Sequence, residues 1–135
     1  MITRARISVI TVVLNAASHL EETIKSVIEK KATVNLDYLI IDGGSTDGTI
    51  EIIRRYENQL YYWISERDFG IYDAMNKGWV AASDDSYVLF LGAGDWLISL
   101  PDNIVSYARN DVVYGSVLMG KGTIFKARTG FHLRL

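Results

Sequence analysis

Residues 39–49, LIIDGGSTDGT, decide the fold that this sequence predicts. The three residues before Asp42 form the kind of apolar run that a strand buried on both faces requires. The run ends at Asp42 in a turn rich in glycine and hydroxyl side chains, and helical periodicity begins at Ile50. A buried strand that leads through a tight turn into a helix is typical of a parallel α/β sheet.

Apolar runs of strand length recur on both sides of this stretch. They cover residues 7–14, 36–41, 60–65 and 87–91. Helical patterns separate the runs, so crossover helices would join successive strands and the strands would lie parallel. The sequence therefore predicts a single α/β domain over residues 1–135, with a mostly parallel, Rossmann-like sheet and helices on both faces.

The first two helices have recognisable start signals. Ser18 stands at capping-box spacing from Glu21, so we expect the first helix to begin there and to end near Lys31. Ser45 or Thr46 should cap the second helix, because either hydroxyl can accept a hydrogen bond from an unpaired amide of the first turn.

The second half of the chain contains three further predicted elements. A third helix should span residues 71 to about 82. A short helix is expected over residues 103–109, shortly after the only proline, and a fifth strand over residues 111–119.

The composition narrows the class of partner. With 14 basic and 16 acidic residues the formal net charge is −2, so no electrostatic argument favours a nucleic-acid partner. The absence of cysteine excludes disulfides and thiolate metal sites and fits a reducing compartment. Arg4 and Arg6 precede residues 7–14 as in a short signal peptide, but the β-branched run favours a retained strand and a cytoplasmic location.

Polar side chains follow three of the predicted strands. They belong to Asn15, Asp42 and Asp95. Ligands of parallel sheets bind beyond the carboxyl ends of the strands. If the three strands are neighbours, these side chains line one rim of the sheet.

Asp42 admits two interpretations. In the first it is a solvated turn carboxylate, and residues 43–49 form a tight turn and a helix cap around it. In the second it accepts hydrogen bonds from a nucleobase, because an unpaired charge at the end of an apolar strand would be costly. Neither the P-loop pattern GxxxxGK[ST] nor a GxGxxG after the first strand is present, so both common nucleotide-binding classes fit poorly.

Three other side chains are candidates for ligand binding. Asp73 and Asn76 lie three residues apart on the third predicted helix and share an edge near its N-terminus. Asp95 follows the apolar run 87–91 and would suit a hard divalent cation that keeps waters and ligand phosphates as its other ligands. A loop aspartate that begins a turn gives the same pattern.

Four segments, taken in order, resemble the N-terminal half of a bacterial family 2 glycosyltransferase with the GT-A fold. They are ISVITVVLNAASHLEETIKSV, LDYLIIDGGSTDGTIEII, YWISERDFGIYDAMNKGW and VLFLGAGDW. The match runs from about residue 7 to residue 115. The resemblance implies an inverting, metal-assisted transferase of polysaccharide biosynthesis. It would move a sugar from a nucleotide-sugar donor, with a UDP-sugar as the first candidate, to a glycan or lipid-linked acceptor.

The resemblance also implies roles for individual residues. Val13 and Asn15 would border the nucleotide, and Asp42 would read the base. Asp73 and Asn76 would lie beside the nucleotide and the diphosphate.

The metal and the catalytic base are less completely matched. Asp95 matches the last acidic residue of the family's metal motif and would hold Mg²⁺ or Mn²⁺ on the diphosphate, but residues 92–95, GAGD, keep only that one carboxylate. Neither Asp102 nor Asp111 matches the family's general base, so the catalytic residue is unassigned. We therefore expect a domain that is C-terminally truncated relative to the family and transfers sugar weakly or not at all.

Two alternatives remain open at this point. The first is a non-catalytic nucleotide-binding or assembly module that forms a homo-oligomer through an uncovered sheet surface. The second is an unrelated flavodoxin-like domain that binds flavin. For the transferase, glycan assembly on lipid carriers would place the protein peripherally at the cytoplasmic membrane face.

Overall fold

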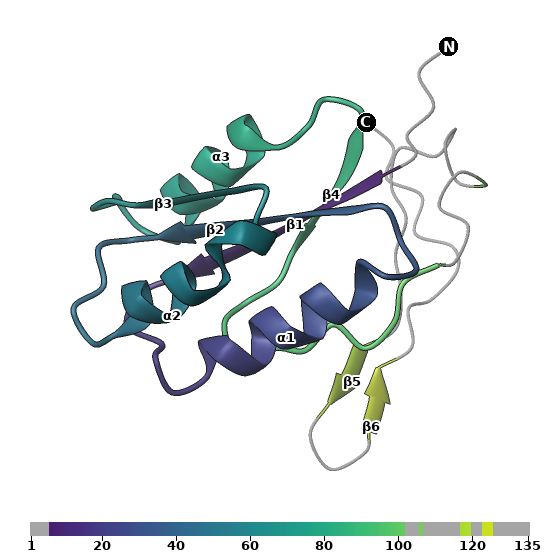
Figure 1. Cartoon of the computed structure of the whole chain (residues 1–135), viewed down its shortest axis with the longest axis horizontal. Helices are drawn as coiled ribbons and strands as arrows, with labels where there is room; N and C mark the ends of the chain where they lie inside the picture. The colour runs from purple at the N-terminus through teal and green to yellow at the C-terminus, as the bar shows by residue number, and fades with distance from the viewer. Residues whose placement is uncertain (1–5, 102–105, 107–116, 120–122, 126–135) are drawn as a thin grey trace.

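The computed structural model describes residues 6–101, 106, 117–119 and 123–125, and its largest unit is a four-stranded parallel sheet (Figure 1). Its strands, in the spatial order β3-β2-β1-β4, are β1 (Arg6–Val13), β2 (Leu36–Asp42), β3 (Tyr62–Ser65) and β4 (Ser86–Phe90). β1 pairs with β2 from Ile7 opposite Leu36 to Val13 opposite Asp42. The four predicted strands and their parallel arrangement are confirmed, with small shifts at the ends.

The described residues form three α-helices between the strands. They are α1 (Leu20–Lys30), α2 (Thr49–Tyr56) and α3 (Ile71–Ala81), and a 3-10 turn, η1 (Glu57–Gln59), follows α2. Both predicted caps are wrong. The N-cap of α1 is His19 and that of α2 is Gly48, and neither of these two residues makes a capping hydrogen bond through a side chain. The Ser45 hydroxyl instead accepts a hydrogen bond from Asn15 N and donates one to the carboxylate of Asp42.

The helices cover both faces of the sheet, as predicted. Figure 1 shows α1 and α2 on one face and α3 on the other. The side chains of β1 alternate between the two faces, so Val9 packs in the layer with α1 and α2 while Ile10 packs in the layer with α3. Both side chains are fully buried, which explains why apolar residues occur on both faces of the strand.

Gly78 lets α3 lie close to the sheet. A Cβ added at this position would lie 2.5 Å from Cγ2 of Ile10 and 3.3 Å from Cγ1 of Ile41. Any side chain at residue 78 would therefore push α3 away from β1 and β2. Since Asp73 is in the first turn of the same helix, the fit at Gly78 also sets the position of a predicted binding residue.

Two short strands, β5 (Val117–Met119) and β6 (Thr123–Phe125), form an antiparallel pair. The predicted fifth strand is confirmed over residues 117–119, and its first part, residues 111–116, lies outside the described residues. The helix predicted over residues 103–109 also lies outside them, apart from Ser106. Within the described part of the chain, no helix has both the length and the apolar character needed to cross a membrane.

Candidate functional site

The carboxyl ends of β2, β1 and β4 meet at one edge of the sheet. Backbone hydrogen bonds of 2.9 Å, from Gly43 N to Val13 O and from Leu91 N to Ile10 O, continue the pairing beyond the ends of β2 and β4. The strand order turns back between β1 and β4, which is where open α/β sheets bind ligands. The polar residues predicted to line this rim follow neighbouring strands; they are Asn15, Asp42 and Asp95.

Asp42 is fully buried and organises the turn after β2. Its Oδ2 accepts hydrogen bonds from Gly44 N (3.0 Å), Ser45 N (2.9 Å) and the Ser65 hydroxyl (2.6 Å), and its Oδ1 accepts one from the Ser45 hydroxyl. These donors replace the water that a buried carboxylate loses. Asp42 is thus neither a solvated turn carboxylate nor exposed to a ligand in this structure. Its role in reading a base remains a prediction.

Asn15 adopts a left-handed backbone conformation, with φ of 50°, directly after β1. Two contacts hold it there: Asn15 N donates to the Ser45 hydroxyl (2.7 Å), and Asn15 Oδ1 accepts from Thr46 N (2.8 Å). Ser45 therefore connects the buried carboxylate of Asp42 to the backbone of Asn15. This network joins the ends of β1 and β2 into one surface, on which Asn15 is exposed.

Asp47 ties the loop after β1 to the start of α2. Its Oδ1 accepts hydrogen bonds from Thr49 N (3.1 Å) and the Thr49 hydroxyl (2.5 Å), and its Oδ2 accepts one from Ala17 N (3.1 Å). The hydrogen bond from the Thr49 side chain, reinforced by the backbone donors, lowers the pKa of Asp47 below its ordinary value of 3.8. The same carboxylate complements the positive end of α2.

Replacing Asp47 with asparagine should weaken the acid sensitivity of the fold. Because the pKa of Asp47 is lower in the folded than in the unfolded chain, its stabilising effect is complete above pH 3.8 and disappears as the pH falls through the folded value. Melting temperatures measured at pH 5.5 and pH 3 should therefore differ less for Asp47→Asn than for the unmodified chain. Asp84→Asn, at an exposed position, is the control and should leave that difference unchanged.

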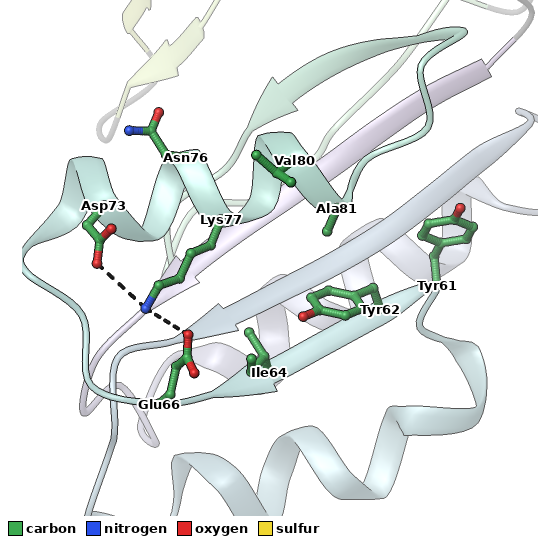
Figure 2. Close-up of a pocket in the computed structure, with 9 residues that line it drawn as sticks. All are labelled: Tyr61, Tyr62, Ile64, Glu66, Asp73, Asn76, Lys77, Val80 and Ala81. Carbon is green, nitrogen blue, oxygen red and sulfur yellow. Dashed lines mark ion pairs between the residues drawn. The ribbon is translucent and has the colours of Figure 1, made fainter.

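An open groove of about 750 Å³ lies between β3 and α3 (Figure 2). It runs from the start of β3, where Tyr61 and Tyr62 line it, to Glu66, the residue directly after that strand. Asp73 and Asn76 of α3 line it as well, so the structure brings together these two predicted residues. Asn15, Asp42 and Asp95 do not line this groove; they belong to the rim formed by the strand ends.

Asp73 takes part in an ion-pair cluster at one end of the groove. Lys77 Nζ lies 3.0 Å from Glu66 Oε1 and 3.6 Å from Asp73 Oδ2, as Figure 2 shows. The hydrogen bond to Glu66, together with both negative charges, raises the pKa of Lys77 above its ordinary value. Asp73 Oδ2 also accepts from Phe69 N (2.9 Å), which fixes the chain entering α3.

Asp95 is exposed in a turn held by α1. Asp95 N donates to Gly92 O (3.1 Å), and Gly94 N donates to the Thr23 hydroxyl of α1 (2.8 Å). No group of three or more acidic, histidine or cysteine side chains that would enclose a metal ion occurs within the described ranges. Asp95 fits a divalent cation only as a single carboxylate oxygen donor, with a ligand's oxygens completing the coordination.

Val13 and Asp68 differ most from what the sequence suggested. The Val13 side chain is buried in the layer with α1 and α2, so only its backbone reaches the rim, and its place in the site stays a prediction. Asp68 was not among the predicted residues, yet its carboxylate lies directly against Gly43 at the end of β2. Gly43, a residue without a side chain directly after Asp42, is the sequence signal that points to such a close approach.

Comparison with known sequences identifies the family. Residues 8–128 match the family model described as "Glycosyl transferase family 2". An uncharacterized glycosyltransferase of Mycobacterium tuberculosis is 35% identical over 120 residues, which are 87% of this chain. The chain spans 42% of the length of that relative.

Solved structures agree with the fold. The complex of S. aureus TarS (residues 1–349) with UDP-GlcNAc gives a TM-score of 0.57 at 23% identity, covering 67% of this chain and 27% of TarS. The mannosyltransferase PcManGT from Pyrobaculum calidifontis, in complex with GDP-Man and Mn²⁺, gives 0.63 at 23% identity, covering 82% of this chain and 34% of that enzyme. Both support the α/β architecture described above.

Proposed function

Because this chain belongs to glycosyl transferase family 2, we propose that it binds a nucleotide-sugar donor and serves the transfer of the sugar to a hydroxyl acceptor. The observation that carries the proposal is the polar rim at the carboxyl ends of β2, β1 and β4 in a chain of this family. The relatives bound to UDP-GlcNAc and GDP-Man support the class of donor.

The proposed role of each residue in donor binding follows from its position at or near the rim. Asp42 and Ser45 hold the loop after β2 against Asn15, so a nucleoside lying across the strand ends would meet a rigid surface. Asp73 and Asn76 would contact the donor from the first turns of α3. We include Val13 through its backbone, since its side chain is buried.

Asp95 is the proposed protein ligand of Mg²⁺ or Mn²⁺. Such an ion, when bound, would neutralise the negative charge that develops on the departing diphosphate. In the proposed inverting reaction the acceptor oxygen forms a bond to the anomeric carbon from the face opposite the diphosphate, whose bond to that carbon breaks. The proton of the acceptor hydroxyl passes to a general base. We assign this role to none of the residues discussed above.

We further propose a glycan or lipid-linked hydroxyl as the acceptor, in polysaccharide biosynthesis at the cytoplasmic side of a membrane. Tyr72 and Trp79 on α3 are exposed apolar side chains, which supports a role for that helix in binding another molecule. A second copy of the chain is one such partner. Light scattering would distinguish a monomer from a homo-oligomer.

Calorimetric titration with UDP and GDP, each with and without Mn²⁺, tests the donor site. We expect one nucleotide to bind, and Asp95→Ala to reduce the enhancement of its affinity by Mn²⁺ about tenfold or more, since one charged ligand is lost. Asp84→Ala, an exposed carboxylate outside the rim, is the matched control and should bind as the unmodified chain does.

Three outcomes of this titration have distinct meanings. Absence of binding by the folded chain would contradict the proposed function. Binding that Mn²⁺ does not strengthen would contradict the role of Asp95 alone. Binding with no sugar transfer to any tested acceptor would favour the non-catalytic nucleotide-binding module over the transferase.

A further inference from the structure

Asp68 lies in the loop between β3 and α3. Its carboxylate reaches the rim next to Gly43, which follows β2 and has no side chain. A Cβ added to Gly43 would lie 2.6 Å from Asp68 Oδ2 and 3.2 Å from its Cγ. Gly43 is the residue directly after β2, and its amide still pairs with Val13 O. The carboxylate of Asp68 therefore occupies the space that a side chain at the end of β2 would fill.

The two oxygens of Asp68 have different surroundings. Oδ1 accepts a hydrogen bond from Gly70 N (3.1 Å), which fixes the orientation of the carboxylate. Oδ2 has no hydrogen-bond donor among the described residues, and the side chain is only half-buried. One oxygen is thus held by the loop while the other remains able to accept a hydrogen bond from a ligand.

Asp42 does not compete for that contact. It is fully buried, and four donors of the chain's own turn and of Ser65 already satisfy its oxygens. A ligand could reach Asp42 only if this network broke, which would leave several buried donors unpaired. Asp68 is next to the same strand end and needs no such rearrangement.

The charge of Asp68 selects the part of the ligand that can lie beside it. A carboxylate accepts hydrogen bonds and repels phosphate oxygens, so the diphosphate would not lie at Asp68. The strand order places β1 between β2, beside Asp68, and β4, after which Asp95 follows. A nucleoside diphosphate lying across these strands would have its base at β2 and its diphosphate at β4.

We propose that Asp68 is a specificity-determining residue that accepts a hydrogen bond from the ring N–H of the donor's nucleobase, in the space left open by Gly43. This inference rests on the proposed function, because it assigns a role within that donor site. The ring N–H flanked by a carbonyl is common to uracil (N3–H) and guanine (N1–H). Cytosine and adenine lack it, so their nucleotides should be disfavoured.

Titration of the full chain with nucleotides methylated at that nitrogen tests the contact. One arm compares the affinity for UDP with that for N3-methyl-UDP, and the other compares GDP with N1-methyl-GDP. The arm in which the unmethylated nucleotide binds identifies the preferred base. For the preferred base, the methylated nucleotide should bind about tenfold to a hundredfold more weakly, since a hydrogen bond to a charged acceptor is lost. In Asp68→Ala this ratio should fall to about one, and in Asp84→Ala it should stay unchanged.

The ratio distinguishes recognition from a merely structural effect. If Asp68→Ala weakens the normal and the methylated nucleotide equally, Asp68 contacts the ribose or only supports the loop, and the inference is wrong. The inference is also wrong if the unmodified chain binds both nucleotides equally. If it binds neither, the proposed function fails and this inference with it.

Gly43→Ala provides an independent test on the strand side. Its added methyl would lie against Asp68 Oδ2 and displace the carboxylate, so it should lower the discrimination against the methylated nucleotide. Because Gly43 has no left-handed φ, alanine is compatible with its backbone and the chain should remain folded. In an Asp68→Ala background the same substitution should have little further effect on discrimination; an additive loss would contradict the shared role.

Discussion

Asp42→Ala should destabilise the fold by about 3–5 kcal/mol, because it leaves buried donors without an acceptor. The carboxylate accepts from Gly44 N, from the amide and hydroxyl of Ser45, and from the hydroxyl of Ser65. Because Asp42 is fully buried, bulk solvent does not contact these donors in place of the missing carboxylate. Urea denaturation followed by circular dichroism measures the change in the free energy of unfolding.

The control for this experiment is another aspartate that has no such network. Asp84 is exposed, and Asp84→Ala should change the free energy of unfolding by less than about 0.5 kcal/mol. A loss of less than about 1 kcal/mol in Asp42→Ala would show that the turn does not depend on its carboxylate. Asp42 would then be free for direct contact with a ligand, as the sequence had suggested.

Gly78→Val should cost about 3 kcal/mol, because the contact between α3 and the sheet has no room for a side chain. The nearest atom to an added Cβ is Cγ2 of Ile10, at 2.5 Å, in a residue that is itself fully buried. Removal of a helix-interior glycine would otherwise stabilise α3 by up to about 1 kcal/mol, so the packing clash decides the sign. Thermal unfolding monitored by circular dichroism gives the change in stability.

A double-mutant cycle identifies the clash as the cause. Ile10→Ala removes both atoms of Ile10 that an added Cβ would approach, so Gly78→Val should cost less in that background than in the unmodified chain. Tyr72→Val, at an exposed position of α3, controls for the helix propensity of valine and should cost less than about 1 kcal/mol. If the losses of stability caused by Gly78→Val and Ile10→Ala were additive, the clash with Ile10 would not be the cause of the destabilisation.

Apolar periodicity was sufficient to predict the four strands of the main sheet and their parallel arrangement. Most residues of the run from Ile7 to Val13 are buried, on both faces of the strand, so its apolar residues can be recognised from the sequence pattern. The caps were predicted wrongly because Ser18 and Ser45 have the right spacing, but the partner that a hydroxyl chooses depends on the fold. Ser45 donates to Asp42 rather than capping α2.

The amino-acid sequence by itself determined the parallel α/β architecture, the helices on both faces and the family, because these follow from local patterns and motifs along the chain. The tertiary structure alone decided which carboxylate is available at the rim. Asp42 is closed by donors from two segments, whereas Asp68 reaches Gly43 from a loop that follows another strand. Hydrogen-bond saturation and close approach depend on three-dimensional distances between residues far apart in the chain, which no local pattern contains.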